Sequence, residues 1–302
     1  VQGLHEAAVP CRLAEYEVIE RGFAMGLVQP KPPRQRVGLS AAVIGSGPAG
    51  LAAAWQLNRA GVSVTVYEKD ALAGGFLRYG IPDFKLEKAV IDRRIRLLEQ
   101  EGIIFEYGVE AGKDVSDRFL RQRHDLIVLA VGARRKRDLV IPGRELGGIC
   151  FAVDYLAAQN RLNSRELHAL PPELDARGKH VVVLGGGDTG SDCVGMARRQ
   201  GALSVSQYEI LPRPPVNRSE SNPWPEWPRT LRTSSSHEEG CERRWNISSL
   251  AFVSSETDAE KVGGLKAEEV TWRMENNRPP VPAPVPGSTF TKKVDLVLLA
   301  LG

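Results

Sequence analysis

The residues of this chain best suited to chemistry are glycines that follow a short apolar run. Residues 41–44 read as a buried parallel strand, which ends at Gly45-Ser46-Gly47-Pro48-Ala49-Gly50, a match to G-x-G-x-x-G. In such a turn the first glycine permits the sharp bend, the second lets the backbone approach a diphosphate, and the third lets the next helix pack closely. The chemistry predicted here is anion binding by main-chain N–H groups at the start of a helix.

The flanking sequence supplies the elements that must position this turn. Pro48 suits the first helical position, an alanine-rich stretch propagates the helix, and Gly61 ends it. Alternating valines then form a second strand, and Glu68 follows where an acid can accept hydrogen bonds from ribose hydroxyls. A bare G-x-G-x-x-G is common by chance, so the complete strand, turn, helix, strand and acid carries the prediction of a dinucleotide site.

The same pattern recurs later in the chain. Residues 180–184 form a second apolar strand, and Gly185-Gly186-Gly187-Asp188-Thr189-Gly190 is a second turn, followed by a helix to about Gln200. In both copies the last glycine of the turn precedes the glycine that closes the helix by 11 residues. We therefore expect two dinucleotide sites, for which a flavin and a nicotinamide are the natural pair.

Other glycines extend each unit. Two apolar strands end at glycine turns, one over residues 126–133, which include Gly132, and one over residues 294–302. In flavoproteins with two dinucleotide sites, such strands mark the places where the chain crosses between domains. Gly74 and Gly75 follow the first unit, and we expect their backbone to approach a flat ring closely, the alternative being an ordinary turn.

The second unit leaves the choice between NAD and NADP open. Glu209 is the positional counterpart of Glu68 if the preceding loop carries one extra residue, and an acid there favours NAD. Arg213 and Arg218 follow closely and suit a 2′-phosphate, as NADP requires.

Composition sets the class of protein. A chain of 302 residues suits two domains, and 42% hydrophobic with 25% charged residues is typical of a globular protein. A net charge of +3 is too small to indicate nucleic acid. No apolar run approaches the roughly 18 residues of a membrane span, and the first residues have no secretory layout, so we expect a cytoplasmic protein.

Metal binding is not predicted. The four cysteines are scattered without a C-x-x-C pair, which argues against an iron–sulfur site or a redox disulfide within this chain. Cys193 lies within the second dinucleotide helix and reads as a small core residue. His237 stands beside two glutamates, but no second histidine lies at ligand spacing.

The remaining patterns predict secondary structure. Residues 14–25 form a charged helix, and residues 86–101 form an amphipathic packing helix that Gly102 ends. Residues 271–274 and the stretch from Phe290 look like hairpin strands joined by a proline-rich loop over residues 276–287.

Five runs together resemble a known family. They are GSGPAGLAAA from Gly45, GGFLRYGIPDFKLEK from Gly74, GGGDTGSDC from Gly185, YEILPRPP from Tyr208 and RTSSSHEEGCERRWN from Arg232. The chain resembles the small (beta) subunit of bacterial NADPH-dependent glutamate synthase over nearly its whole length. The second run and especially the last are the most specific to that family.

The resemblance implies an α/β fold with two Rossmann-like domains. Residues 1–36 would be an N-terminal helical segment and linker, 37–137 the first part of an FAD-binding domain, and 138–302 an inserted NADPH-binding domain. The family carries its cysteine-rich 4Fe–4S region ahead of this chain's first residues. It also has a return segment of the FAD domain beyond Gly302. We therefore expect a chain truncated at both ends, without the cluster ligands.

The resemblance also implies a function. In that family NADPH gives a hydride to FAD, and the electrons reach the large (alpha) subunit, which makes glutamate from glutamine and 2-oxoglutarate. Such a step calls for no catalytic side chain. The alternatives are a related flavin module, of the dihydropyrimidine dehydrogenase or ferredoxin-NADP transhydrogenase type, and an inactive fragment. By match to the motifs, the expected FAD-binding residues are Gly45, Ser46, Gly47, Pro48, Ala49, Gly50, Glu68, Gly74, Gly75 and Gly132. The expected NADPH-binding residues are Gly185, Gly187, Asp188, Thr189, Gly190 and Arg213.

Overall fold

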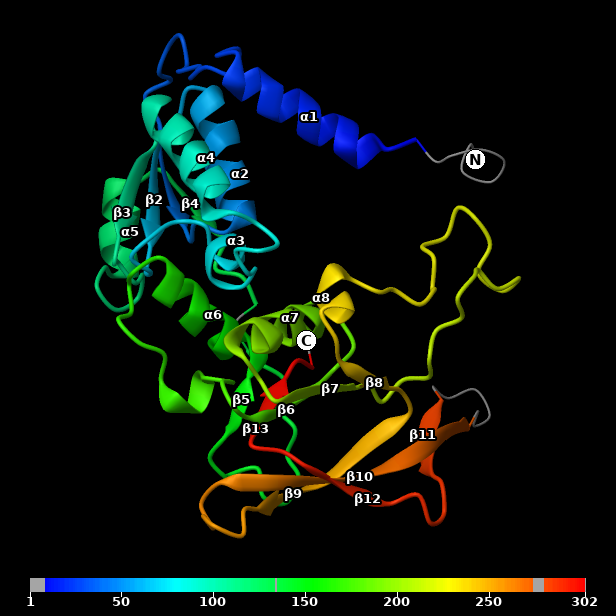
Figure 1. The fold of residues 1–302 in the computed structure, drawn as a ribbon. Coiled ribbons are helices and arrows are strands. Elements are labelled where there is room, and N and C mark those ends of the chain that lie inside the picture. Colours follow the sequence, from blue (N-terminus) through cyan, green and yellow to red (C-terminus); the bar gives the residue numbers. More distant parts are fainter. Residues whose placement is uncertain (1–8, 134, 274–279, 302) are drawn as a thin grey trace. The chain divides into compact units, whose positions relative to one another are not determined.

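The computed structural model of the chain describes residues 9–133, 135–273 and 280–301 (Figure 1). By their contacts the residues divide into two compact units, one of Val1–Gly75 with Lys88–Gly132 and the other of Phe76–Glu87 with Ala133–Gly302. Residues 76–87 thus group with the second unit, although they lie inside the range predicted for the FAD-binding domain.

The first unit is built on a parallel sheet with the strand order β3-β2-β1-β4. Its strands are β1 (Ser40–Ile44), β2 (Ser63–Glu68), β3 (Ile104–Tyr107) and β4 (Leu126–Leu129). Its helices are α1 (Cys11–Ala24), α2 (Pro48–Arg59), α4 (Lys88–Gln100) and α5 (Asp117–Arg123). Leu120 of α5 packs against Ala42, Ile44 and Tyr67, so β1 is covered and its apolar run is buried.

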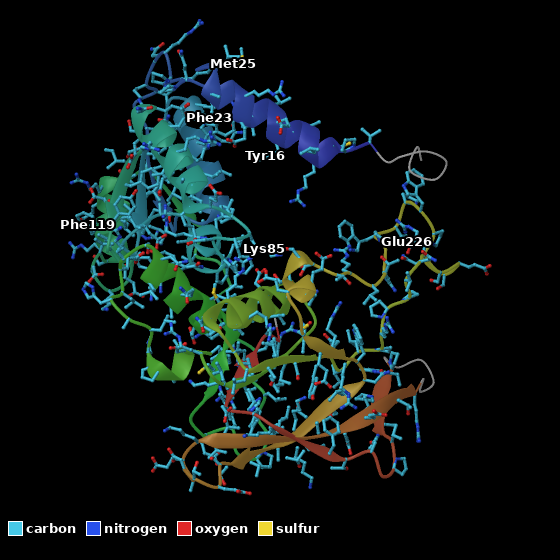
Figure 2. The ribbon with its side chains drawn as sticks, in the orientation of Figure 1. Tyr16, Phe23, Met25, Lys85, Phe119 and Glu226 are labelled. Atoms are coloured by element: carbon cyan, nitrogen blue, oxygen red, sulfur yellow. The ribbon has the colours of Figure 1, made fainter. Side chains whose placement is uncertain are left out.

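Two helices of this unit follow directly from their sequences. The predicted amphipathic helix is α4, which buries Ile91, Ile95, Leu97 and Leu98. By contrast α1 has no buried residue. It is tied to α4 through Arg93, whose guanidinium donates to both carboxylate oxygens of Glu20 at 2.6 and 2.8 Å. The same guanidinium lies 3.8 Å from the ring centroid of Phe23, a residue of α1 that is labelled in Figure 2.

The second unit has three layers (Figure 1). Its parallel sheet has the order β5-β13-β6-β7-β8, and β9, β11 and β12 pair with β10 in an antiparallel sheet. The parallel strands are β5 (Ile149–Phe151), β6 (His180–Leu184), β7 (Ser204–Tyr208), β8 (Glu242–Arg244) and β13 (Leu296–Leu299). The antiparallel strands are β9 (Ile247–Ser254), β10 (Val262–Arg273), β11 (Val281–Pro284) and β12 (Phe290–Lys293). The helices are α3 (Phe76–Tyr79), α6 (Ala152–Asn163), the 3₁₀ turn η2 (Pro172–Leu174), α7 (Asp188–Gln200) and α8 (Ser235–Glu238).

Side-chain alternation along the parallel strands explains the layers. Val181 and Val183 point to a core shared with α6 and α7, whereas Val182 and Leu184 point to a core shared with the antiparallel sheet. Cys193 of α7 is fully buried in the first of these cores, as predicted, and burial raises the pKa of its thiol.

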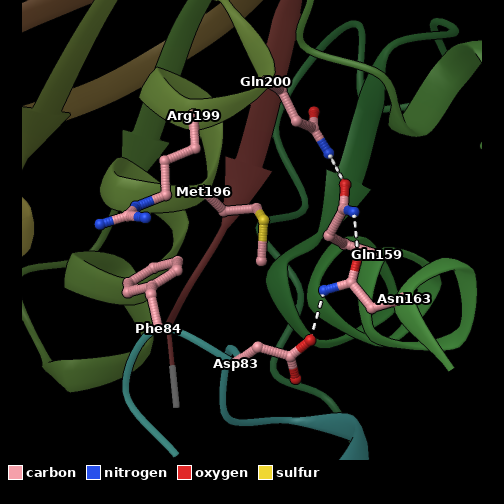
Figure 3. Close-up of a pocket in the computed structure, with 7 residues that line it drawn as sticks. All are labelled: Asp83, Phe84, Gln159, Asn163, Met196, Arg199 and Gln200. Atoms are coloured by element: carbon pink, nitrogen blue, oxygen red, sulfur yellow. Dashed lines mark hydrogen bonds between the residues drawn. The ribbon is translucent and has the colours of Figure 1, made fainter. Parts of the chain in front are cut away.

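Segment 76–87 is fastened to the helical face of the second unit. Asn160 of α6 donates to the carbonyls of Tyr79 and Ile81 at 2.9 and 3.0 Å. A chain of side-chain amides, Gln200 to Gln159 to Asn163, ends on the carboxylate of Asp83 and borders a cavity of about 230 Å³ (Figure 3). These polar groups of the cavity wall bond to one another, and the last of these bonds attaches segment 76–87 to α6.

The predicted fold class is confirmed, and so are the helices at residues 14–25 and 86–101 to within a few residues. One prediction was wrong: residues 281–284, assigned to a proline-rich loop, form β11, which pairs with β10 from Val270 to Arg273. Pro282 and Pro284 are tolerated because β11 is an edge strand. The predicted end of the first hairpin strand, Met274, lies outside the described residues.

The described residues contain neither a membrane-spanning helix nor a metal-binding cluster. Among them, no helix combines the length and the apolar character that crossing a membrane requires. Within the same ranges, no cluster of three or more His, Cys, Asp or Glu side chains is placed to hold a metal ion.

Candidate functional site

The first glycine turn lies between two strands. The N–H of Gly45 donates to the carbonyl of Tyr67 at 2.9 Å, and a Cβ built on Gly45 would lie 2.6 Å from the carbonyl oxygen of Ala130. Gly45 has φ +101°, and a Cβ on Gly50 would lie 1.9 Å from the Gly45 oxygen. Gly45 therefore requires glycine for conformation and for space, and Gly50 requires it for space.

The second turn repeats this geometry. The N–H of Gly185 donates to the carbonyl of Tyr208 at 2.9 Å, and a Cβ on Gly185 would lie 2.2 Å from the oxygen of Ala300. A Cβ on Gly190 would lie 2.3 Å from the Gly185 oxygen. Each turn is thus enclosed by its own neighbouring strands, β2 and β4 in one unit and β7 and β13 in the other.

The middle glycines differ from the outer ones because they border open space. Within the described ranges, no heavy atom outside the adjacent residues lies within 4 Å of a Cβ built on Gly47. The same holds for Gly187 among the residues that the structure describes. Both are N-caps with extended backbone, at φ −66° and −77°, so neither backbone strain nor a neighbouring atom requires glycine there, and a side chain would instead occupy the open space beside each turn.

Each turn presents the start of a helix to that open space. The first helical N–H bonds run from Leu51 to Gly47 and from Ser191 to Gly187, so the amides ahead of them lie outside the helical ladder. Pro48, Ala49, Asp188 and Thr189 are exposed there. Unpaired main-chain N–H groups and the positive end of the helix dipole make each site suited to a diphosphate.

In both units an acid at the end of the second strand accepts hydrogen bonds from main-chain N–H groups, one of which belongs to the glycine turn. Glu68 accepts from the N–H groups of Ser46 and Asp70, both at 2.9 Å. Glu209 accepts from Gly186 at 2.7 Å and Leu211 at 3.0 Å, which are the corresponding positions. The predicted correspondence of these two acids, with one extra residue in the second loop, is therefore seen in the structure.

The structure brings Gly74 and Gly75 to the first turn. The N–H of Gly74 donates to the hydroxyl of Ser46 at 3.0 Å, and that hydroxyl also bonds to Glu68. Gly75 has φ +52°, and a Cβ there would lie 2.8 Å from the Cα of Gly47. Gly132 is exposed with φ +69° and lies two residues after Ala130, whose carbonyl lies against Gly45. All the residues predicted to bind FAD thus belong to or adjoin one turn.

Arg213 belongs to a basic cluster beyond β7. Its guanidinium lies 5.2 Å from the ring centroid of Trp245, and that of Arg243 lies 4.9 Å from the same ring. Burial lowers the pKa of Arg243, and the charge of Arg213 lowers it further. Two cations sharing one aromatic ring suit an anion with several oxygens. Arg243 and Trp245 were not singled out from the sequence, although both lie in the run ERRW.

His237 is the third residue of α8 and forms a capping box with Ser234, the N-cap of that helix. Its Nδ1 accepts from the N–H of Ser234 at 3.1 Å, so the ring proton is on Nε2, which bonds to the side-chain oxygen of Gln207 at 2.9 Å. Burial, with the nearby charges of Arg243 and Lys85, lowers the pKa of His237 to about 4.

Comparison with known proteins agrees with this geometry. Residues 39–222 match the family model of the pyridine nucleotide-disulphide oxidoreductases, and the chain belongs to that family. It is 47% identical over its whole length to the glutamate synthase [NADPH] small chain of Mycobacterium tuberculosis, which confirms the resemblance stated above. It is also 41% identical over 99% of its length to the glutamate synthase [NADH] of Saccharomyces cerevisiae.

The match to the longer relatives is partial. The chain spans 61% of the length of the M. tuberculosis small chain and 14% of the yeast protein. Among solved structures, M. tuberculosis FprA in complex with NADPH is similar with a TM-score of 0.66 and 19% identity, over 90% of this chain and 71% of that one. At that identity the likeness shows the fold.

The lowered pKa of His237 predicts a pH-dependent stability. The unfolded chain takes up a proton near pH 6.5 and the folded chain only near pH 4, so stability is lost as the pH falls between these values. Allowing for solvent screening, we expect His237 to account for about 2 kcal/mol of that loss. Urea unfolding measured at several pH values should show a steeper decline below pH 6.5 for the parent chain than for His237→Asn, which has no titrating ring. Parallel curves would contradict the assignment.

Proposed function

We propose that this chain is the electron-input part of a glutamate synthase, with FAD at the Gly45 turn and NADPH at the Gly185 turn. The proposal rests on the duplicated turn, each copy with its own backing strand and its own open second glycine. It is supported by the 47% identity to a glutamate synthase small chain along the whole chain. We further propose the domain limits 37–137 for FAD and 138–302 for NADPH.

The residues of the first turn fit the diphosphate and ribose of FAD. Gly47 leaves the space, and α2 begins beside it at Pro48, so the start of that helix is available to an anion there. Glu68 is buried beside Ser46, where its carboxylate is held by main-chain N–H groups at the end of β2, the position from which an acid binds ribose hydroxyls. Gly74 and Gly75 continue the same surface.

The second turn fits the diphosphate of NADPH in the same way, through Gly187 and the first residues of α7. Arg213 and Arg243 carry the proposal of NADPH over NADH, because a 2′-phosphate supplies the negative charge that two adjacent guanidiniums favour. Glu209 accepts hydrogen bonds from the main-chain N–H groups of Gly186 and Leu211, and we propose that it stabilises the turn.

The two cofactors supply the hydride chemistry when they are bound. The task of the chain is to bind and orient them, so we assign no catalytic side chain. The proposed electron acceptor is the large (alpha) subunit, reached through iron–sulfur clusters, and the expectation that their ligands lie outside this chain stays a prediction. The expected cytoplasmic location stays a prediction.

Cofactor binding can be tested with two matched glycine variants. We expect the chain, reconstituted with FAD, to be yellow and to bleach when NADPH is added without oxygen. Gly47→Ala and Gly187→Ala have room for a methyl group in the folded chain, so both should keep the parent melting temperature. Gly47→Ala should lose FAD, whereas Gly187→Ala should keep FAD but need about 10-fold or more NADPH to bleach. A parent chain that takes up no FAD would overturn the proposal.

The basic cluster predicts a cofactor preference. We expect Arg213→Ala and Arg243→Ala each to raise the KM for NADPH by about 10-fold or more, since each removes a charge-assisted hydrogen bond. The KM for NADH should change less than about twofold, because NADH has no phosphate there. Arg177→Ala, at an exposed arginine ahead of β6, is the matched loss of one charge. Equal effects on both nucleotides would rule out this role.

The assignment to glutamate synthase needs the partner subunit. When the chain is supplied within the complete small subunit and mixed with the large subunit, NADPH oxidation should yield glutamate from glutamine and 2-oxoglutarate. NADPH-driven flavin reduction without any glutamate would instead favour a flavin module of another complex. Omitting 2-oxoglutarate is the control, and it should stop glutamate formation but not flavin reduction.

A further inference from the structure

The two turns differ at one buried position. Gly45 bonds to the carbonyl of Tyr67 and Gly185 to that of Tyr208, so the preceding residues, Val66 and Gln207, correspond. Val66 is fully buried and apolar, whereas Gln207 puts an amide that is 2% exposed at the same place. Burying a side-chain amide costs free energy unless its donors and its acceptor form hydrogen bonds, so Gln207 needs hydrogen-bond partners at this position.

Gln207 is part of a directed hydrogen-bond relay that ends on the turn. Its Nε2 donates to the carbonyl of Gly185 at 2.9 Å and would lie 2.8 Å from a Cβ on Gly190. Its Oε1 accepts from Nε2 of His237, which has that proton because Nδ1 accepts from Ser234. His237 therefore determines which way the Gln207 amide faces.

The far end of the relay is firmly anchored. Ser236, beside His237, is fully buried, and its side chain lies 2.8 Å from a Cβ built on Gly195 of α7. The hydroxyl of Ser234 bonds to that of Ser191, and Lys85 donates to the hydroxyl of Ser235 at 2.8 Å. The run from Ser234 to His237 is thus seated on the helix that the glycine turn begins.

We propose that His237 is a positioning residue for the nucleotide of the second unit, acting through Gln207 on the carbonyl of Gly185. This inference rests on the proposed function, since it assumes that the Gly185 turn binds NADPH. Fixing that carbonyl fixes the peptide planes that follow it, and so the direction of the N–H groups offered to the diphosphate. The first turn has the buried Val66 at this position, and a valine side chain has no group that could donate a hydrogen bond to the turn.

Two substitutions at one position separate positioning from folding. His237→Asn keeps an acceptor for the Ser234 N–H but is too short to reach Gln207. His237→Gln keeps a donor for Gln207 but offers no acceptor to Ser234. NADP⁺ affinity, measured by calorimetric titration of the FAD-reconstituted chain, should fall about fivefold in His237→Asn and be largely rescued in His237→Gln. Melting temperature should follow the opposite order, and Glu238→Gln, an exposed neighbour, is the matched control.

Gln207→Met tests the middle of the relay. It should weaken NADP⁺ binding about as much as His237→Asn, and the double variant should be no weaker than either one, because both break the same path. FAD content should stay at the parent level in all of them, since the Gly45 turn is untouched.

The outcomes are distinguishable. A parent chain that binds no NADP⁺ overturns the proposed function and this inference with it. If the parent chain binds NADP⁺ and His237→Asn binds it with the same affinity, the positioning role is overturned and the proposed function is not. Loss of NADP⁺ affinity in step with melting temperature across both His237 variants would show that the residue only stabilises the fold.

Discussion

Both glycine turns depend on a single steric constraint: a peptide unit has to fit between two strands where no side chain has room. Gly45 lies against Ala130 and Gly185 against Ala300, each with a carbonyl oxygen where a Cβ would stand. The strands that supply these contacts, β4 and β13, come long after their turns in sequence. Each turn therefore takes its shape only when its whole parallel sheet has assembled.

Local patterns were enough to predict the units themselves. The strand before each turn, the helix after it and the closing glycine are contained in residues 40–61 and 180–201, and their periodicity indicates each element. The acids could be paired as well, because Glu68 and Glu209 both follow a strand whose start is fixed by a glycine. Such features depend on neighbours in sequence.

The features that the sequence did not reveal depend on contacts between residues that are far apart in the chain. The strand β11 lies in a proline-rich stretch that only pairing with β10 makes extended. Arg243 approaches Arg213 because β8 lies beside β7, a register that no local pattern encodes. The bond from His237 to Gln207 joins residues 30 positions apart, so the RTSSSHEEG run could be recognised as distinctive without its role being visible.

The two units share one frame, which consists of a strand, a glycine turn, a helix and a second strand that ends at an acid. Each unit adds further residues to that frame. The first unit adds Gly74 and Gly75 through Ser46, while the second adds the basic cluster and the run that carries His237. The frame carries the proposal that both units bind a nucleotide, and the additions carry the proposal of which nucleotide each unit holds.

The path of segment 76–87 limits how this protein can be taken apart. The chain leaves the first unit after Gly75, packs on α6 and α7, and returns at Lys88 before leaving again after Gly132. A piece beginning at Ala133 would lack the partners of Asn160 and Asn163 and would uncover the helix surface that Phe84 packs against. Gene fragments that separate the halves at one cut should therefore aggregate, whereas grafting the twelve-residue segment back through a linker would restore a self-contained half.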